Sequence, residues 1–152
     1  MTTEPGPPGP GGSGPPWAVT LAVPLHWGEM DAFGHVNNAV YFRWFESARM
    51  SYFERLGWPQ VQRETGIGPI LHSTQARFRA PLVWPDTILV ATRVSELSGD
   101  RFTMLYEVRS RSLGCLAAEG SGVIVAFDYR TLAKAPLPDL ICERMAQLEA
   151  GA

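Results

Sequence analysis

Four polar side chains crowd the segment just before a strongly apolar stretch of the sequence. Asp31, His35, Asn37 and Asn38 lie within eight consecutive residues, and the apolar segment 39–56 follows at once. If that segment is a helix, its first turn presents unpaired backbone N–H groups and the positive end of the helix dipole. Negative charge that forms on a substrate oxygen is stabilised in such a place. The spacing therefore indicates an enzyme site.

Segment 39–56 has the pattern of a long buried helix. Its large side chains recur at helical intervals, at Tyr41, Trp44, Phe45, Ala48, Tyr52 and Leu56. Asn38 is a suitable N-cap, Gly57 suits the position just past the helix, and Pro59 prevents the helix from continuing. Further apolar residues lie outside the main stripe, so we expect a sheet to wrap around this helix.

Most of the remaining chain predicts strands. Alternating apolar residues favour strands over 17–27, 70–80, 87–97, 101–110 and 115–129, a hairpin turn at 98–100 and a short helix over 137–149. Gly120 and Gly122 would let another element approach the last strand closely. The expected fold class is α+β: an antiparallel five-stranded sheet, its later strands joined by tight turns, around one long central helix. Pairing of an edge strand with a second copy would cover an exposed edge.

Length and composition favour a single domain over residues 17–152. The chain has 152 residues, of which 45% are hydrophobic, whereas residues 1–16 contain six prolines and five glycines and are expected to be a disordered tail. A net charge of −2 offers no general attraction to nucleic acid. Cys115 and Cys142 have no metal-binding spacing, and neither a signal segment nor a membrane span is evident. A cytoplasmic location is expected.

The segment from Asp31 to Phe42, followed by Glu46, Arg49 and the pair Leu56-Gly57, resembles the hotdog-fold acyl-CoA thioesterases of the 4-hydroxybenzoyl-CoA thioesterase type. The resemblance extends to Arg79-Ala80-Pro81 and Asp86, and so covers about residues 17–129. It implies a hotdog fold and hydrolysis of an acyl-coenzyme A thioester, in a site formed where two subunits join edge to edge. It implies no separate cofactor, because coenzyme A is part of the substrate. A homodimer or homotetramer is expected.

The same resemblance suggests roles for individual residues. Asp31 matches the acidic residue that attacks the thioester carbonyl or activates water, and Asn38 matches the position whose backbone N–H polarises that carbonyl. Many bacterial relatives have His at the position of Asn38, so His35 is a third catalytic candidate. Five further residues are expected to bind the substrate, the two arginines through coenzyme A phosphates: Gly34, Asn37, Tyr41, Arg79 and Arg101.

Three alternatives stay open from the sequence. Glu46 and Arg49 are three residues apart and are expected to pair, although Glu46 is also a secondary acid candidate. Hydration of an enoyl thioester on the same fold is one alternative reaction, and acyl-CoA binding without catalysis is another. The sequence does not identify the acyl group or decide between dimer and tetramer.

Overall fold

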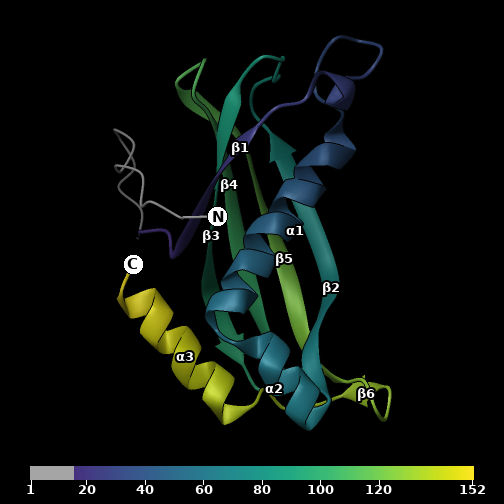
Figure 1. Ribbon diagram of the computed structural model, residues 1–152, viewed down its shortest axis with the longest axis vertical. Helices are drawn as coiled ribbons and strands as arrows, with labels where there is room; N and C mark the ends of the chain where they lie inside the picture. Colours follow the sequence, from purple (N-terminus) through teal and green to yellow (C-terminus); the bar gives the residue numbers. More distant parts are fainter. Residues whose placement is uncertain (1–15) are drawn as a thin grey trace.

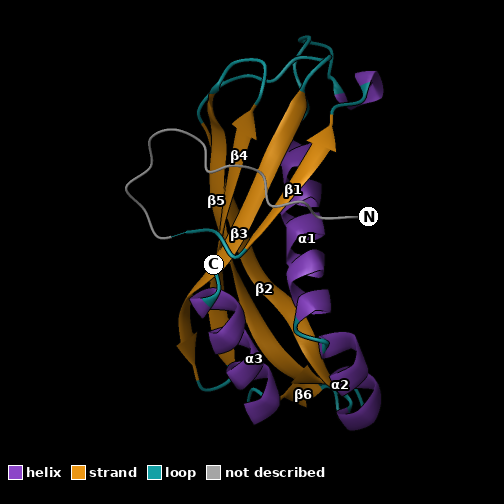
Figure 2. Ribbon diagram, turned by 60° about the vertical axis from the view of Figure 1, so that its left-hand side comes forward, coloured by secondary structure: helices purple, strands orange, loops and turns teal. Residues whose placement is uncertain are grey.

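The long helix α1 (Asn38–Arg55) lies against one face of a curved antiparallel sheet, as Figures 1 and 2 show from two directions. This computed structural model describes residues 16–152; residues 1–15 of the predicted tail lie outside that range. The sheet contains the strands β1 (Val19–Pro24), β2 (Ile67–Phe78), β3 (Thr87–Ser98), β4 (Arg101–Ser110) and β5 (Cys115–Asp128). The short elements are η1 (Trp27–Glu29), α2 (Trp58–Thr65) and β6 (Ala133–Lys134), and α3 (Asp139–Ala150) ends the fold. The α+β architecture of five strands around a central helix is confirmed.

The sheet order is β1-β3-β4-β5-β2, with β6 added to the end of β5. One expectation is wrong here, because β2 and β3 are not joined by a tight turn. Segment 79–86 instead carries the chain from one edge strand to a position beside β1. Leu82 in this segment is fully buried, and its carbonyl accepts a hydrogen bond from the N–H of Val36. The connection is therefore anchored in the core, and it lies beside the polar loop that precedes α1.

Burial of α1 follows the predicted stripe. Tyr41, Trp44, Phe45, Ala48 and Tyr52 are all buried against the sheet. The ring of Phe45 stacks on that of Tyr106 in β4, with 4.6 Å between the ring centroids. The resulting contact fixes the middle of the helix over the middle of the sheet.

The start of α1 differs from the prediction by one residue, whereas its end is as predicted. Asn37, and not Asn38, is the N-cap, since its side-chain oxygen accepts a hydrogen bond from the N–H of Ala39. Gly57 adopts a left-handed backbone (φ +65°) after the helix, as expected. Pro59 does not stop helical structure, however, because it lies in the first turn of α2, where a proline needs no hydrogen-bond partner. Helix α2 buries Trp58 and Val61 and was missed by the sequence analysis.

Helix α3 covers the part of β3 that extends past the short strand β1. The Glu149 carboxylate accepts hydrogen bonds from the Tyr52 hydroxyl (2.7 Å) and from the Val94 N–H (2.8 Å). Arg144 donates to the carbonyl of Leu56 at the end of α1 (2.8 Å). The last helix is thus tied both to α1 and to the sheet. None of the helices in residues 16–152 is long and apolar enough to cross a membrane.

Gly120 is the position where helix and sheet approach most closely. A Cβ atom added there would lie 2.5 Å from Cε2 of Phe45 and 2.6 Å from the Gln75 carbonyl oxygen. At Gly122, two residues along the same face, the nearest atoms would be 3.4 Å away, which is ordinary contact. The expected close approach is therefore confirmed at the first of the two glycines.

We predict that Gly120→Ala lowers the free energy of unfolding by about 1 to 3 kcal/mol, because neither the Phe45 ring nor the neighbouring strand can move freely. Gly122→Ala is the matched control and should cost clearly less. Urea unfolding followed by circular dichroism measures both. Equal losses in the two variants would contradict the close packing of α1 on β5.

Candidate active site

A tight turn presents Asp31 in front of α1. The Gly34 N–H donates to the Asp31 carbonyl (3.1 Å), and the Asp31 N–H donates to the His35 carbonyl (2.8 Å). Gly34 has φ +82°, a left-handed backbone that suits glycine. One oxygen of the Asp31 carboxylate accepts the N–H of Phe33 (2.9 Å), which fixes the side chain. The other oxygen has no protein partner within residues 16–152 and is available to a ligand.

The start of α1 is fixed by Asn37. Its side chain caps Ala39, its carbonyl accepts the N–H of Val40 (3.0 Å), and its own N–H donates to the Glu29 carbonyl (2.9 Å). Asn38 is consequently the first residue of the helix. Its backbone N–H has no hydrogen-bond partner in the described part of the chain. An unpaired N–H at the positive end of the helix dipole is a donor for developing negative charge.

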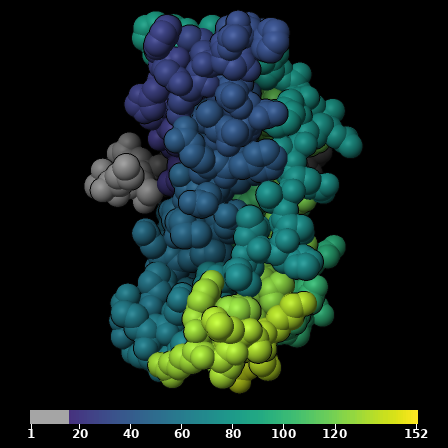
Figure 3. All heavy atoms as spheres, turned by 90° about the vertical axis from the view of Figure 1, so that its right-hand side faces the viewer, coloured from purple at the N-terminus to yellow at the C-terminus, as the bar shows by residue number. Residues whose placement is uncertain are grey.

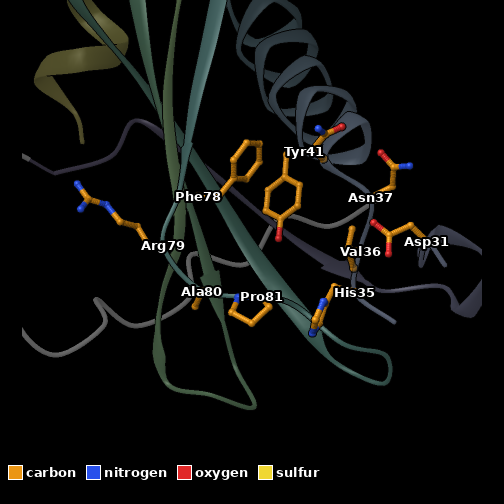
Figure 4. A pocket seen from close by; sticks show the side chains of 10 residues that line it. Asp31, His35, Val36, Asn37, Tyr41, Phe78, Arg79, Ala80 and Pro81 are labelled. Carbon is orange, nitrogen blue, oxygen red and sulfur yellow. The ribbon is translucent and has the colours of Figure 1, made fainter. Parts of the chain in front are cut away.

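These groups open into one pocket of about 490 Å³, shown in Figure 4. The turn and the start of α1 form one side of the pocket, and the end of β2 with the crossing segment forms the other. Figure 4 shows the Asp31 carboxylate pointing toward the space in front of Tyr41. The lining residues are Asp31, His35, Val36, Asn37, Asn38, Tyr41, Phe78, Arg79, Ala80 and Pro81.

The pocket brings together six of the eight residues named from the sequence. Gly34 supports the turn without lining the pocket, and His35 enters from the side of Pro81 (Figure 4). Arg79 lines the pocket, and its guanidinium pairs with the carboxylate of Glu119. Arg101 is the first residue of β4 and lies at the end of the strand away from the pocket, about 30 Å from Ser110 at the other end. It pairs with Asp100 (2.9 Å). Any contact of Arg101 with substrate stays a prediction.

Four apolar lining residues were not among the predicted site residues: Val36, Phe78, Ala80 and Pro81. Phe78 is the last residue of β2 and keeps 47% of its surface exposed. Its ring meets that of Tyr41 edge to face, with 4.9 Å between centroids. The sequence did contain a signal for Phe78. This bulky aromatic residue directly precedes Arg79-Ala80-Pro81, a segment that the family resemblance already included.

Glu46 and Arg49 form the expected pair, outside the pocket lining. Their charged atoms are 3.9 Å apart, and Arg49 also donates to the Tyr106 hydroxyl (3.1 Å). Arg49 is buried, whereas the Glu46 side chain is 65% exposed. Arg49 therefore joins α1 to the sheet beneath it through Tyr106 of β4.

Comparison with known proteins decides the family. Residues 25–145 match the family model described as the thioesterase-like superfamily. The chain belongs to this superfamily. Its membership confirms the expected hotdog fold, and it supports the expected thioester hydrolase activity.

Individual relatives of this thioesterase-like chain agree with that assignment. A protein of Aquifex aeolicus (strain VF5) is 35% identical over 81 residues, which are 53% of this chain and 63% of that relative. The long-chain acyl-CoA thioesterase FadM of Escherichia coli (strain K12) is 23% identical over 119 residues, which are 78% of this chain and 90% of that protein. The structure of a Thermus thermophilus thioesterase complexed with coenzyme A and zinc is 29% identical, with a TM-score of 0.78, and the match covers 88% of this chain and 96% of that one.

Within residues 16–152, no group of three or more His, Cys, Asp or Glu side chains is arranged to hold a metal ion. Cys115 and Cys142 are free thiols.

Asp86 anchors the crossing segment that forms the far wall of the pocket. Its carboxylate accepts hydrogen bonds from the N–H of Thr87 (2.7 Å), from the N–H and hydroxyl of Ser112 (3.0 and 2.9 Å), and from the Ser110 hydroxyl. Partial burial by itself would raise the pKa of Asp86, but these donors outweigh it and hold the pKa below its ordinary value. The ionised carboxylate thus stabilises the folded state.

We predict that Asp86→Asn lowers the free energy of unfolding at pH 7 by about 1 to 3 kcal/mol, because charge-assisted hydrogen bonds are lost. Since the folded pKa is depressed, this contribution is present above the unfolded pKa of about 3.9 and is lost as the pH falls below it. Urea unfolding at pH 7 and at successively lower pH should show the gap between variant and wild type closing. A gap that is constant with pH would contradict the role of the charge.

Proposed function

We propose that the protein hydrolyses the thioester bond of an acyl-coenzyme A in the pocket between Asp31 and the start of α1. One observation carries the proposal: a fixed carboxylate with a free oxygen and an unpaired helix N–H, that of Asn38, line the same pocket. Superfamily membership and the likeness to a thioesterase bound to coenzyme A support it. The motif around Asp31 favours the 4-hydroxybenzoyl-CoA thioesterase type.

In the proposed reaction the thioester carbonyl accepts a hydrogen bond from the Asn38 N–H. The Asp31 carboxylate either attacks the carbonyl carbon or takes a proton from the attacking water. In the first route the C–S bond breaks as an anhydride between the acyl group and Asp31 forms, and water then hydrolyses this anhydride and restores the Asp31 carboxylate. In the second route water adds directly to the carbonyl carbon and the C–S bond breaks. In both routes coenzyme A leaves as a thiolate that takes up a proton from the water, and the acyl group leaves as a carboxylate. Coenzyme A enters as part of the substrate, so the proposal includes no separate cofactor. Asn37 acts as a positioning residue, because its side chain holds the helix start in place.

The proposed active unit is a dimer formed through β2, with the tetramer as the larger alternative. Strand β2 is an edge of the sheet, and Ile70 and Leu71 on it are 38% and 40% exposed. Figure 3 looks onto this face and shows the teal atoms of β2 running down the molecule beside the blue atoms of α1. Pairing of two β2 edges would satisfy their open N–H and C=O groups and would bring a second chain close to Phe78 and Arg79.

The cytoplasmic location stays a prediction.

We predict that Asp31→Asn lowers kcat by about 10²- to 10⁴-fold, because the amide is neither a nucleophile nor a base. Release of free thiol from a panel of acyl-CoA esters measures the rate. Glu46→Gln is the matched control: it replaces the other candidate acid and should keep nearly full activity. Wild-type rates in Asp31→Asn would refute the mechanism, and crotonyl-CoA hydration or tight ester binding without thiol release would favour the two alternatives.

The Asn38 position allows a test of the backbone donor alone. Asn38→Pro removes the N–H, and proline is tolerated at the first residue of a helix, where Asn37 already has an extended backbone (φ −60°, ψ 139°). We predict a loss of about 10²- to 10³-fold in kcat with the helix content unchanged. Asn38→Ala keeps the N–H and should stay close to wild type. If both variants lost activity equally, the side chain and not the amide would be the functional group.

A further inference from the structure

The face of the sheet away from α1 carries a second pocket, of about 560 Å³, which we call the outer pocket. Tyr106 and Gly120 point toward α1, because the Tyr106 ring stacks on Phe45 and a Cβ atom at Gly120 would meet the same ring. Successive residues of a strand point to opposite faces, so the side chains before and after these two residues point away from the helix. The outer pocket shares no lining residue with the candidate active site. Four of these outward side chains line it: Leu105, Glu107, Glu119 and Ser121.

Arg93 on β3 forms one end of the outer pocket, and part of its guanidinium is buried without a hydrogen bond. The guanidinium carbon lies 5.3 Å from the centroid of the Trp17 ring, which lines the same pocket. Its Nε is buried and has no hydrogen-bond partner among the described residues. A buried donor without a partner costs free energy, and a charge removed from water without a counter-ion costs more. An anion bound beside Arg93 would reduce this cost.

Arg77 on β2 forms the other end of the outer pocket. Strands β5 and β4 lie between β2 and β3, so the backbones of the two arginines are three strand spacings apart, about 14 Å. None of the ion pairs within residues 16–152 includes Arg77 or Arg93. Leu105 lies between them, directly opposite Arg93 and Ser121 in the strand register. The outer pocket thus has a guanidinium without a counter-ion in the described chain at each end, and an apolar side chain in between.

Glu107 and Glu119 also line the outer pocket, but each already has an arginine partner. Glu107 accepts two hydrogen bonds from Arg109 (3.1 and 2.9 Å), and Glu119 pairs with Arg79. Each of these pairs has no net charge, so the positive charges at the two ends of the pocket stay uncompensated. Guanidinium groups bind carboxylates and phosphates through paired N–H donors. The chemistry of the outer pocket therefore favours an anion.

We propose that the outer pocket binds an organic anion with an oxyanion group, carboxylate or phosphate, at each end. One end would pair with Arg93 and the other with Arg77, and a carbon chain between them would lie over Leu105. The polar groups in the middle are already satisfied, since Gln75 donates to the Ser121 hydroxyl (3.0 Å). A volume of about 560 Å³ suits a molecule of metabolite size rather than a single inorganic ion. This inference is independent of the proposed thioesterase function.

The test measures binding to the full chain by isothermal titration calorimetry, with probes that differ only in the number of charged ends. Adipate is compared with hexanoate, and the bisphosphate of hexanediol with the monophosphate of hexanol. Wild type should bind at least one doubly charged probe about tenfold or more tightly than its singly charged match, the effect of one charge-assisted hydrogen bond. The tighter of the two doubly charged probes shows whether the ligand is a carboxylate or a phosphate.

Two variants locate the site. Arg93→Gln and Arg77→Gln should each weaken binding of the doubly charged probe by about tenfold or more, and so bring it close to the singly charged one. Arg111→Gln is the matched control, because Arg111 is exposed and lines neither pocket, and it should bind as wild type does. Both pocket variants should keep the wild-type rate of thiol release and the wild-type circular dichroism spectrum. If wild type released no thiol from any ester, only the proposed function would be contradicted.

Three results would overturn the inference. Equal affinity for singly and doubly charged probes, or no binding of any of them at millimolar concentration, would exclude an anion held at both ends. Undiminished binding in both Arg93→Gln and Arg77→Gln would place the anion elsewhere on the protein. A change of oligomeric state in these variants by gel filtration, without any anion binding in wild type, would assign the outer pocket to a second copy of the chain.

Discussion

The hydrogen bond from the Ala39 N–H to the Asn37 side chain determines where α1 begins, and the candidate site depends on that start. Asn37 caps α1, so Asn38 is the first residue of the helix and its N–H is left without a partner. The same residue is tied back to Glu29 through its backbone. The loop that carries Asp31 and the helix that carries the free N–H are thereby held in one arrangement. The unpaired N–H lies in the same pocket as Asp31, where a substrate oxygen can accept a hydrogen bond from it.

The rest of the fold keeps this helix end in place relative to the opposite wall. Phe45 is locked between Tyr106 and the bare backbone at Gly120, so α1 cannot slide along the sheet. The opposite wall is the segment that crosses from β2 to β3, and Leu82 and Asp86 fasten it at two points. A pocket between a capped helix and a fastened crossing segment is preorganised, which is what electrostatic stabilisation of a transition state requires.

Much of this arrangement could be predicted from the sequence, because α1 and four of the long strands have strong local patterns. The stripe from Tyr41 to Tyr52 is buried as expected, and the polar cluster before it does line a pocket. The N-cap was misplaced by one residue since Asn37 and Asn38 are equally good caps, and only the folded backbone distinguishes them.

Other features depend on contacts between distant residues, which no local pattern contains. The position of β2 at the far edge of the sheet follows from its pairing with β5, and so does the crossing segment that supplies half of the pocket. The distance of Arg101 from the pocket also depends on strand pairing, because the pairing determines at which end of the sheet the turn between β3 and β4 lies. Helix α2 was missed because Pro59 was interpreted as a stop, although proline is equally at home in a first helical turn.

The two borders of the sheet are unequal, and this difference restricts how copies of the chain can assemble. One border is β2, twelve residues long; the other is β1, six residues long and ending at Pro24, and beyond it the Val94 N–H is already occupied by Glu149. Two long β2 borders would match each other about a two-fold axis, and only the short β1 border of each copy would then stay open. Growth into an open-ended fibril, which needs one border to fit the other, is thereby disfavoured by the geometry of the sheet itself.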